Sequence, residues 1–336
     1  MKRTLCALLS ALFLSTLAIP CSAADTAIPK IRDYPGFADV AEESWCYDAV
    51  KLCYESGLMN GTSETTFGPQ GPLTAAQLVV LTARLYDLRN GGSGAIPALP
   101  DLAQPYLRFL GPEGDLLQAY ALADSPARQI GTEEFFISLS AAADDALPET
   151  CSLVIGFDGY GETLRLEGIR KSYEHIPGIM NQGLTGTGYQ FPSSAATANR
   201  LFLGDAELLD MQDAWWFPAA FYLASQGVLN VSGDLLYRLA PEGQARDEEL
   251  FAQSASRVLF AWLTDLAAGE LSVLHETVSV PDVTEDTQDA DSILRLYRSG
   301  ILTGVDASGR FHGDGTLTRA QAAVMLSRVL DPGLRI

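Results

Sequence analysis

Arg319 is the residue whose position most directly suggests a binding chemistry. It follows Thr318, and Gln321 comes three residues after that threonine, which is the capping-box pattern of a helix start. Arg319 therefore falls in a first helical turn, where the helix dipole disfavours a cation by up to about 1 kcal/mol. An arginine there, together with the free backbone N–H groups, can bind one carboxylate or phosphate. Arg246 precedes another predicted helix in the same way. A salt bridge to a nearby acidic residue is the alternative for both arginines.

Tryptophans are the second kind of candidate, because an indole ring can stack on a sugar. Trp45 and Trp215 each precede an apolar helical segment. Trp45 begins a stripe that continues with Ala49, Leu52 and Cys53 at helical spacing. This position favours a core role for Trp45, with sugar stacking as the alternative.

The sequence shows no arrangement typical of an enzyme. The histidines, His175, His275 and His312, lack the spacing of a metal-binding motif, and no phosphate-binding loop or nucleophile elbow occurs. Glu174 beside His175 could form an acid/base pair, but a solvated loop is the favoured interpretation. Residues 306–315 have the composition of a calcium loop, yet basic side chains interrupt the oxygen ligands. We therefore expect a non-enzymatic protein without a cofactor or metal ion.

The chain contains three copies of an internal repeat. The first covers 37–90, the third covers 279–331, and the second, at 208–264, is degenerate. In each copy an apolar stripe predicts a first helix, a glycine follows it, and a turn leads into a second helix. Two helices of this size cannot cover each other's apolar faces, so the three copies should pack together.

These copies resemble the S-layer homology family. The resemblance rests on an opening F-x-D-V, a tryptophan-led helix, a glycine-bounded loop, an aromatic turn and the T-R-A-Q helix start at 318–321. It implies a pseudo-threefold helical unit that holds exported proteins on anionic, often pyruvylated, cell-wall polysaccharide. The binding residues that it implies are Arg319, Arg246, Trp45, Trp215, Asp39, Asp282, Gly61, Gly304, Thr318 and Gln321.

Three positions depart from the family pattern. Ala75 replaces the arginine in the first copy, Val231 replaces the loop glycine in the second, and Gln288 replaces the tryptophan in the third. We expect at least one of the binding grooves to be inactive.

Residues 91–207 do not resemble the repeat and form an insert. The segments with strand-like composition are 134–140, 152–157, 163–167 and 200–203. Asp158-Gly159 predicts a hairpin turn, whereas 102–123 could be a helix or further strands. The expected fold class is therefore mixed α and β: a helical pseudo-threefold unit with an inserted, sandwich- or barrel-like β module. An enzyme activity, or a protein-interaction or structural surface-layer role, in this insert is the alternative function.

Composition and the first residues bear on location and partners. Residues 1–24 have the basic start and short apolar run of an export signal, and no later run is apolar enough to span a bilayer. The net charge of −20 disfavours nucleic acid and anionic membrane as partners. We expect a secreted, cell-wall-associated protein without membrane insertion. Its expected partners are an anionic secondary wall polysaccharide and, through the insert, other surface proteins.

Three cysteines remain after the predicted export signal. Cys46 and Cys53 are seven residues apart in a helical pattern, which separates them by roughly 10 Å along the axis, too far for a disulfide. We expect these two and Cys151 to be unpaired.

Overall fold

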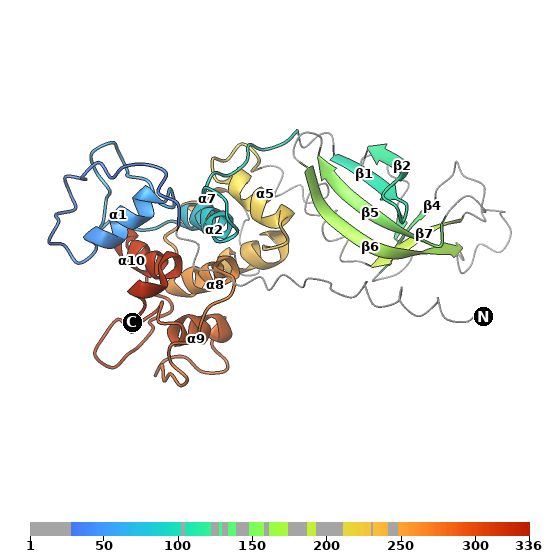
Figure 1. Ribbon diagram of the computed structural model, residues 1–336. Coiled ribbons are helices and arrows are strands. Elements are labelled where there is room, and N and C mark those ends of the chain that lie inside the picture. The colour runs from blue at the N-terminus through green and yellow to red at the C-terminus, as the bar shows by residue number, and fades with distance from the viewer. Residues whose placement is uncertain are drawn as a thin grey trace, which may run out of the picture.

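The computed structural model describes residues 28–101, 105–121, 128–129, 134–138, 148–157, 161–173, 187–192, 211–229, 231–240 and 248–336. Helices and a β-sheet occupy separate parts of the molecule, which confirms the expected mixed fold class (Figure 1). Within the described part, no helix is long and apolar enough to cross a membrane. The predicted export signal lies outside the described residues.

Each repeat forms a unit of two main helices. The first helices are α1 (Tyr47–Glu55), α5 (Phe217–Ser225) and α9 (Ala290–Arg298). The second helices are α2 (Ala75–Arg89), α8 (Arg257–Ala268) and α10 (Arg319–Leu330). Below, units 1, 2 and 3 are the parts built on α1 and α2, on α5 and α8, and on α9 and α10.

Local sequence signals account for the ends of these helices. Thr318 forms the predicted capping box, and Thr74 forms an equivalent one at the start of α2. The Ser256 side chain caps α8 by accepting from the backbone N–H of Leu259. Gly57 follows α1 with φ 81°, a left-handed conformation that a side chain would strain.

Backbone hydrogen bonds join the starts of the second helices into a ring. The Ala75 N–H donates to the Gln253 carbonyl at 2.9 Å, that of Arg257 to Gly315 at 2.9 Å, and that of Arg319 to Gly71 at 3.0 Å. Ala75, Arg257 and Arg319 therefore occupy equivalent positions, each at the first residue of its helix. This ring is the expected pseudo-threefold arrangement.

The three units share one core. Helix α5 packs on α2, α9 on α8 and α1 on α10, so each first helix covers the second helix of the preceding unit. The apolar face of α2 is buried, with Leu78 and Leu85 at most 1% exposed. Burying each such side chain stabilises the fold by about 1.5–3 kcal/mol. A single unit could not bury these side chains alone, because the neighbouring units cover them.

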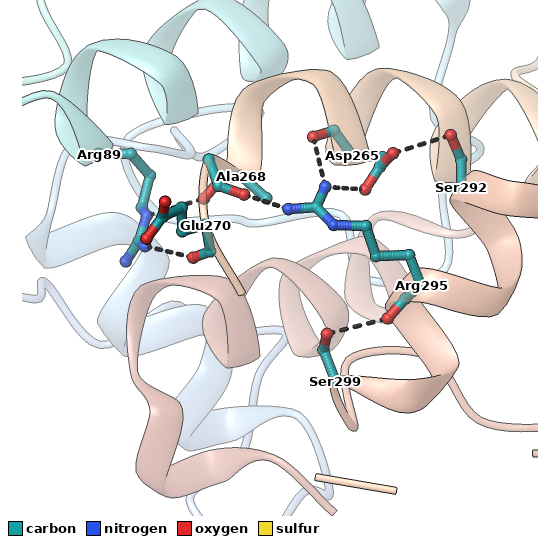
Figure 2. A network of polar contacts seen from close by, with 8 residues as sticks. Arg89, Asp265, Ala268, Glu270, Ser292, Arg295 and Ser299 are labelled. Atoms are coloured by element: carbon teal, nitrogen blue, oxygen red, sulfur yellow. Dashed lines mark hydrogen bonds and ion pairs between the residues drawn. The ribbon is translucent and has the colours of Figure 1, made fainter. Parts of the chain in front are cut away.

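A polar network closes the C-terminal end of α8 (Figure 2). Arg89 of α2 donates to the carbonyls of Ala268 at 3.1 Å and Glu270 at 3.3 Å. Arg295 of α9 pairs with Asp265 and also donates to the Gly269 carbonyl. The last carbonyls of a helix lack partners within it, so two arginines from neighbouring helices satisfy them and fix α8 between α2 and α9.

The insert forms a seven-stranded sheet in the order β2-β1-β5-β6-β7-β4-β3, with antiparallel pairing throughout the described strands. The strands are β1 (Pro105–Leu110), β2 (Leu116–Ala121), β3 (Arg128–Gln129), β4 (Glu134–Ser138), β5 (Thr150–Phe157), β6 (Gly161–Tyr173) and β7 (Thr187–Pro192). Three of the four predicted strands are confirmed, and the open segment 102–123 contributes two more. The predicted strand at 200–203 and the turn at Asp158-Gly159 lie outside the described residues.

The sheet curls over its own core. Phe109 of β1 stacks on Tyr189 of β7 at 5.8 Å between ring centroids, although β5 and β6 separate these strands in the sheet. This curvature agrees with a sandwich- or barrel-like module. At one end, Phe157 contacts Phe221 of α5 at 5.3 Å, so the insert also packs against unit 2.

The described cysteines are free, as predicted. Cys46, Cys53 and Cys151 are buried and form no disulfide. Burial raises the pKa of Cys53 far above its usual range and that of Cys151 to about 12. Cys53 and Cys151 therefore act as small apolar groups rather than as nucleophiles.

Candidate functional site

The candidate site lies at the junctions between units. Junction 1–2 is the place where α5 of unit 2 meets α2, junction 2–3 is where α9 meets α8, and junction 3–1 is where α1 meets α10. At junction 1–2 a hollow of about 180 Å³ is lined by the loop Met59–Gly61 and by Gln77, Arg84, Trp215 and Arg319. All three units thus contribute to one hollow.

Arg319 reaches from unit 3 into the loop of unit 1. It is only 8% exposed, and its guanidinium donates to the carbonyls of Phe67 at 3.0 Å and Asn60 at 2.6 Å. Its charged group also lies 4.7 Å above the Phe67 ring. Within the described part of the chain no carboxylate forms a direct ion pair with Arg319, although the charge of Asp39 acts on it from nearby. Burial lowers the pKa of this arginine, and the negative charge of Asp39 partly opposes that effect.

The equivalent arginine of unit 2 is Arg257, not Arg246. The second helix of this unit begins after Ser256, and a short helix absent from the other units, α7 (Glu248–Ala252), precedes it. This added segment shifted the predicted register, and Arg246 itself lies outside the described residues. Arg257 is buried and donates to the Phe311 carbonyl of unit 3 at 2.7 Å, as Arg319 does to Phe67. Ser256, a typical helix-capping residue directly before Arg257, was the signal in the sequence that could have identified Arg257.

Two further arginines at junction 1–2 were not predicted. Arg84 of α2 lines the hollow and donates to the Leu58 carbonyl at 3.3 Å. Arg32 donates to the Met59 carbonyl at 2.8 Å. Burial, and then the nearby charge of Arg32, lower the pKa of Arg84. Helical spacing on α2 could have indicated Arg84, because it follows Gln77 by two turns on the same face.

The tryptophans are exposed, so the core role expected for Trp45 is wrong. Trp45 is 64% exposed and Trp215 62%. Both lie in the turn two residues before their helix, outside the buried stripe. The core position in unit 2 belongs instead to Trp216, which is 1% exposed and stacks on Phe251 at 3.7 Å. Large exposed aromatic rings at a hollow are typical of ligand contacts.

The predicted aspartates hold backbone groups of their own units. The Asp39 carboxylate accepts from the N–H groups of Phe67 and Gly68, both at 2.8 Å. Asp282 accepts from Phe311 at 2.7 Å and His312 at 2.8 Å. Burial opposes the charge of Asp282, but these N–H groups still lower its pKa. Each aspartate thereby positions a turn whose backbone carbonyl accepts a hydrogen bond from a buried arginine. Asp39 does so for Arg319, and Asp282 does so for Arg257.

The predicted glycines and helix-start residues also shape the backbone. A Cβ on Gly61 would lie 2.5 Å from the Ser63 carbonyl oxygen, and one on Gly304 would lie 2.4 Å from the Gly309 backbone. Thr318 and Gln321 cap α10. Of the predicted residues, the structure brings Arg319, Trp215 and Gly61 together at junction 1–2.

Junction 3–1 has the same residue types as junction 1–2. Arg257 corresponds to Arg319, and Arg328 corresponds to Arg84, with its guanidinium donating to the Ile301 carbonyl at 2.9 Å. Trp45 precedes α1 as Trp215 precedes α5, and α1 packs on α10 as α5 packs on α2. Burial lowers the pKa of Arg328 as well.

Junction 2–3 lacks these residues. Ala75, Leu266 and Gln288 stand where junction 1–2 has Arg319, Arg84 and Trp215. Where unit 1 has the loop that contains Met59–Gly61, unit 2 has the π-helix η3 (Val231–Leu235) and the short helix α6 (Leu236–Leu239). A cleft of about 610 Å³ remains.

One cation does line this cleft, but it is neutralised. Arg238 of α6 pairs with Asp289 at 2.7 Å and lies 3.9 Å above the Trp262 ring. That one binding groove is inactive stays a prediction, and it now applies to junction 2–3.

Comparison with known proteins agrees with this architecture. The S-layer homology domain model matches residues 36–79 and 281–323, which lie in units 1 and 3. An endoglucanase from Bacillus sp. (strain KSM-635) is 36% identical over 83 residues, which are 25% of this chain and only 9% of that enzyme. The chain thus carries S-layer homology domains, which indicate association with the cell surface and bind cell-wall polymers. Unit 2 is assigned by its place in the ring.

Proposed function

We propose that the helical ring anchors this chain non-covalently to an anionic secondary cell-wall polysaccharide, through junctions 1–2 and 3–1. The observation that supports this most directly is Arg319 with Arg84 at the hollow of junction 1–2. Their guanidinium groups donate to carbonyl oxygens and form no direct ion pair among the described residues, in a protein of net charge −20. A guanidinium group that is largely buried and not directly paired with a carboxylate favours an incoming anion.

The ligand group is a single carboxylate on a sugar, such as a pyruvate ketal. A carboxylate can take bidentate hydrogen bonds from guanidinium groups, and the exposed Trp215 supplies a face for the sugar ring. The hollow of about 180 Å³ is too small for a bulky group and accommodates one such substituent.

Co-sedimentation with isolated cell-wall sacculi tests the proposal. The parent protein should sediment with sacculi and should stay in solution once the secondary polymer has been removed from them. Arg319→Gln combined with Arg257→Gln should stay in solution in both cases, provided that circular dichroism shows a folded protein. Equal sedimentation of this double variant and the parent would refute the proposed sites.

The proposal treats the chain as non-enzymatic, with a second candidate function in the insert. The relative that shares the repeat is an endoglucanase, so a wall-tethered hydrolase is the alternative to check. Release of reducing ends from carboxymethylcellulose by the full chain would favour that alternative, whereas a preparation that binds sacculi without such release supports an anchoring role.

A further inference from the structure

The chain contains two asparagines that are directly followed by glycine. Asn60-Gly61 lies in the loop of unit 1, and Asn90-Gly91 follows α2. In such a pair the backbone nitrogen of the glycine can attack the side-chain carbonyl carbon of the asparagine, because glycine has no Cβ that would hinder the approach. Both asparagines are exposed to water, so exposure does not distinguish them.

At Asn60 both reacting groups are ready for this attack. Arg32 donates from its guanidinium to the side-chain oxygen Oδ1 of Asn60 at 2.7 Å. This cation polarises the carbonyl and stabilises the negative charge that develops on the oxygen during the attack. Among the described residues, the N–H of Gly61 has no hydrogen-bond acceptor, so no hydrogen bond is lost when its nitrogen reacts.

At Asn90 both reacting groups are already engaged. Its side-chain nitrogen Nδ2 donates to the Tyr86 carbonyl at 2.8 Å, which holds the amide against the end of α2. The N–H of Gly91 donates to the Leu88 carbonyl at 3.2 Å. No cation contacts the Asn90 side chain within the part of the chain that the structure describes. The same dipeptide therefore stands in a reactive environment at one place and in a protected one at the other.

We propose that Asn60 is a site of spontaneous deamidation, which switches off the arginine hollow of junction 1–2. The Gly61 nitrogen bonds to the side-chain carbon of Asn60, while its proton passes through water to the side-chain nitrogen, which leaves as ammonia. Water then opens the resulting cyclic succinimide and gives aspartate or isoaspartate. Overall, water is consumed, an ammonium ion is released and a carboxylate remains on the chain.

Each product neutralises one arginine of the site. Opening of the ring at the main-chain carbon gives isoaspartate, in which the Asn60 carbonyl that Arg319 contacts at 2.6 Å becomes a carboxylate. Opening at the side-chain carbon gives aspartate, whose carboxylate lies beside Arg32. Either carboxylate competes with an incoming anion for these cations. This consequence for binding rests on the proposed function, whereas the reaction itself does not.

The loop requires the glycine but not the asparagine. A side chain on Gly61 would clash with the backbone of its own loop. In unit 3 the equivalent pair is Thr303-Gly304, counted from the glycines Gly57 and Gly300 that follow α1 and α9. Threonine has no amide to lose, so deamidation weakens junction 1–2 and leaves junction 3–1 intact.

Peptide mapping by mass spectrometry tests the reaction in the full chain. After incubation of the folded protein at mildly alkaline pH, Asn60 should have deamidated at least about fivefold faster than Asn90. Arg32→Gln should slow the reaction at Asn60 by a similar factor and leave Asn90 unchanged, provided that circular dichroism shows a folded protein. In urea the two sites should react at similar rates, because only the folded structure distinguishes them.

The effect on binding is measured with wall polysaccharide freed of peptidoglycan, by calorimetry. Arg257→Gln disables junction 3–1 and serves as the background, so that junction 1–2 alone is observed. In this background Asn60→Asp should weaken binding about tenfold, because its carboxylate occupies the cations. Asn60→Gln, which keeps an amide, and Thr303→Asp, at the equivalent place of unit 3, should bind as the background does.

The outcomes separate the reaction, its consequence and the proposed function. A rate at Asn60 no faster than at Asn90 in the folded protein would overturn the deamidation site, as would an undiminished rate in Arg32→Gln; neither result affects wall anchoring. Background-like binding by Asn60→Asp would overturn the switch. Parent-like binding by Arg319→Gln combined with Arg257→Gln would instead count against the proposed function.

Discussion

Junctions 1–2 and 2–3 share the same packing of main helices but differ in the side chains and the loop that surround the binding surface. At the first, Arg319 donates to carbonyls of an irregular loop beside an exposed Trp215. At the second, the loop is helical and Arg238 is neutralised by Asp289. The ring of backbone bonds is present at both. The comparison teaches that backbone groups assemble the ring, whereas side chains carry the proposed ligand chemistry, so a junction can differ in those side chains without loss of the ring.

The loop glycine and the buried Arg319 should have the largest effects on stability. Gly61→Val places Cβ against the carbonyl oxygens of Ser63 and Thr66, so we expect a loss of about 3 kcal/mol in the free energy of unfolding. Val231→Ala, at the helical equivalent, should cost about 1–2 kcal/mol. Urea denaturation measures both. If Gly61→Val is as stable as the parent, the loop of unit 1 can become helical like that of unit 2, and the contrast between the junctions fails.

The buried arginines should affect both stability and binding. Arg319→Ala leaves the carbonyls of Asn60 and Phe67 without their charged donor, and we expect a loss of about 3 kcal/mol. The melting temperature and the amount of protein that sediments with sacculi should both decrease.

Arg238→Gln is the control for the arginine prediction. Its partner Asp289 already neutralises it at junction 2–3, so wall binding should equal that of the parent. A clear loss of binding in this variant would show that junction 2–3 is active.

The exposed tryptophans should affect binding alone. Trp215→Ala and Trp45→Ala remove rings that are more than 60% exposed, so the melting temperature should stay constant. Each change should weaken wall binding about tenfold, or roughly 1.4 kcal/mol, through loss of ring stacking. Gln288→Ala at junction 2–3 is the matched control and should bind normally. Should all three variants bind alike, the rings do not contact the polymer.

The smallest expected effect is a pH dependence at Asp282. Its folded-state pKa is lowered, so its charge stabilises the fold above the unfolded pKa of about 3.9 and ceases to do so as the pH falls through the folded pKa. Asp282→Asn should therefore lower the melting temperature slightly at pH 7 and match the parent near pH 2. Asp314→Asn, an exposed neighbour on the same turn, is the control. A deficit that persists at pH 2 would assign the effect to hydrogen-bond geometry rather than charge.

Local patterns allowed much of the helical part to be predicted. The capping boxes at Thr74 and Thr318 and the glycine after α1 depend on residues close together in the chain. The register of unit 2 failed because α7 interrupts the pattern, and no local rule states where an added helix will pack. The strands of the insert were predicted where composition was strong, but its curled sheet needed long-range contacts such as Phe109 with Tyr189.

The sequence by itself determined the three repeats, their helix starts and the loss of Arg, Trp and Gly at three named positions. Only the tertiary structure decided which residues meet, because every junction draws on three units distant in the chain. Arg319 and Phe67 touch although 252 residues separate them. The burial of side chains likewise had to be observed. Trp45 and Trp216 both precede an apolar helix, yet Trp45 is exposed and Trp216 lies in the core. A shift of one residue along the chain changes the direction in which the side chain points.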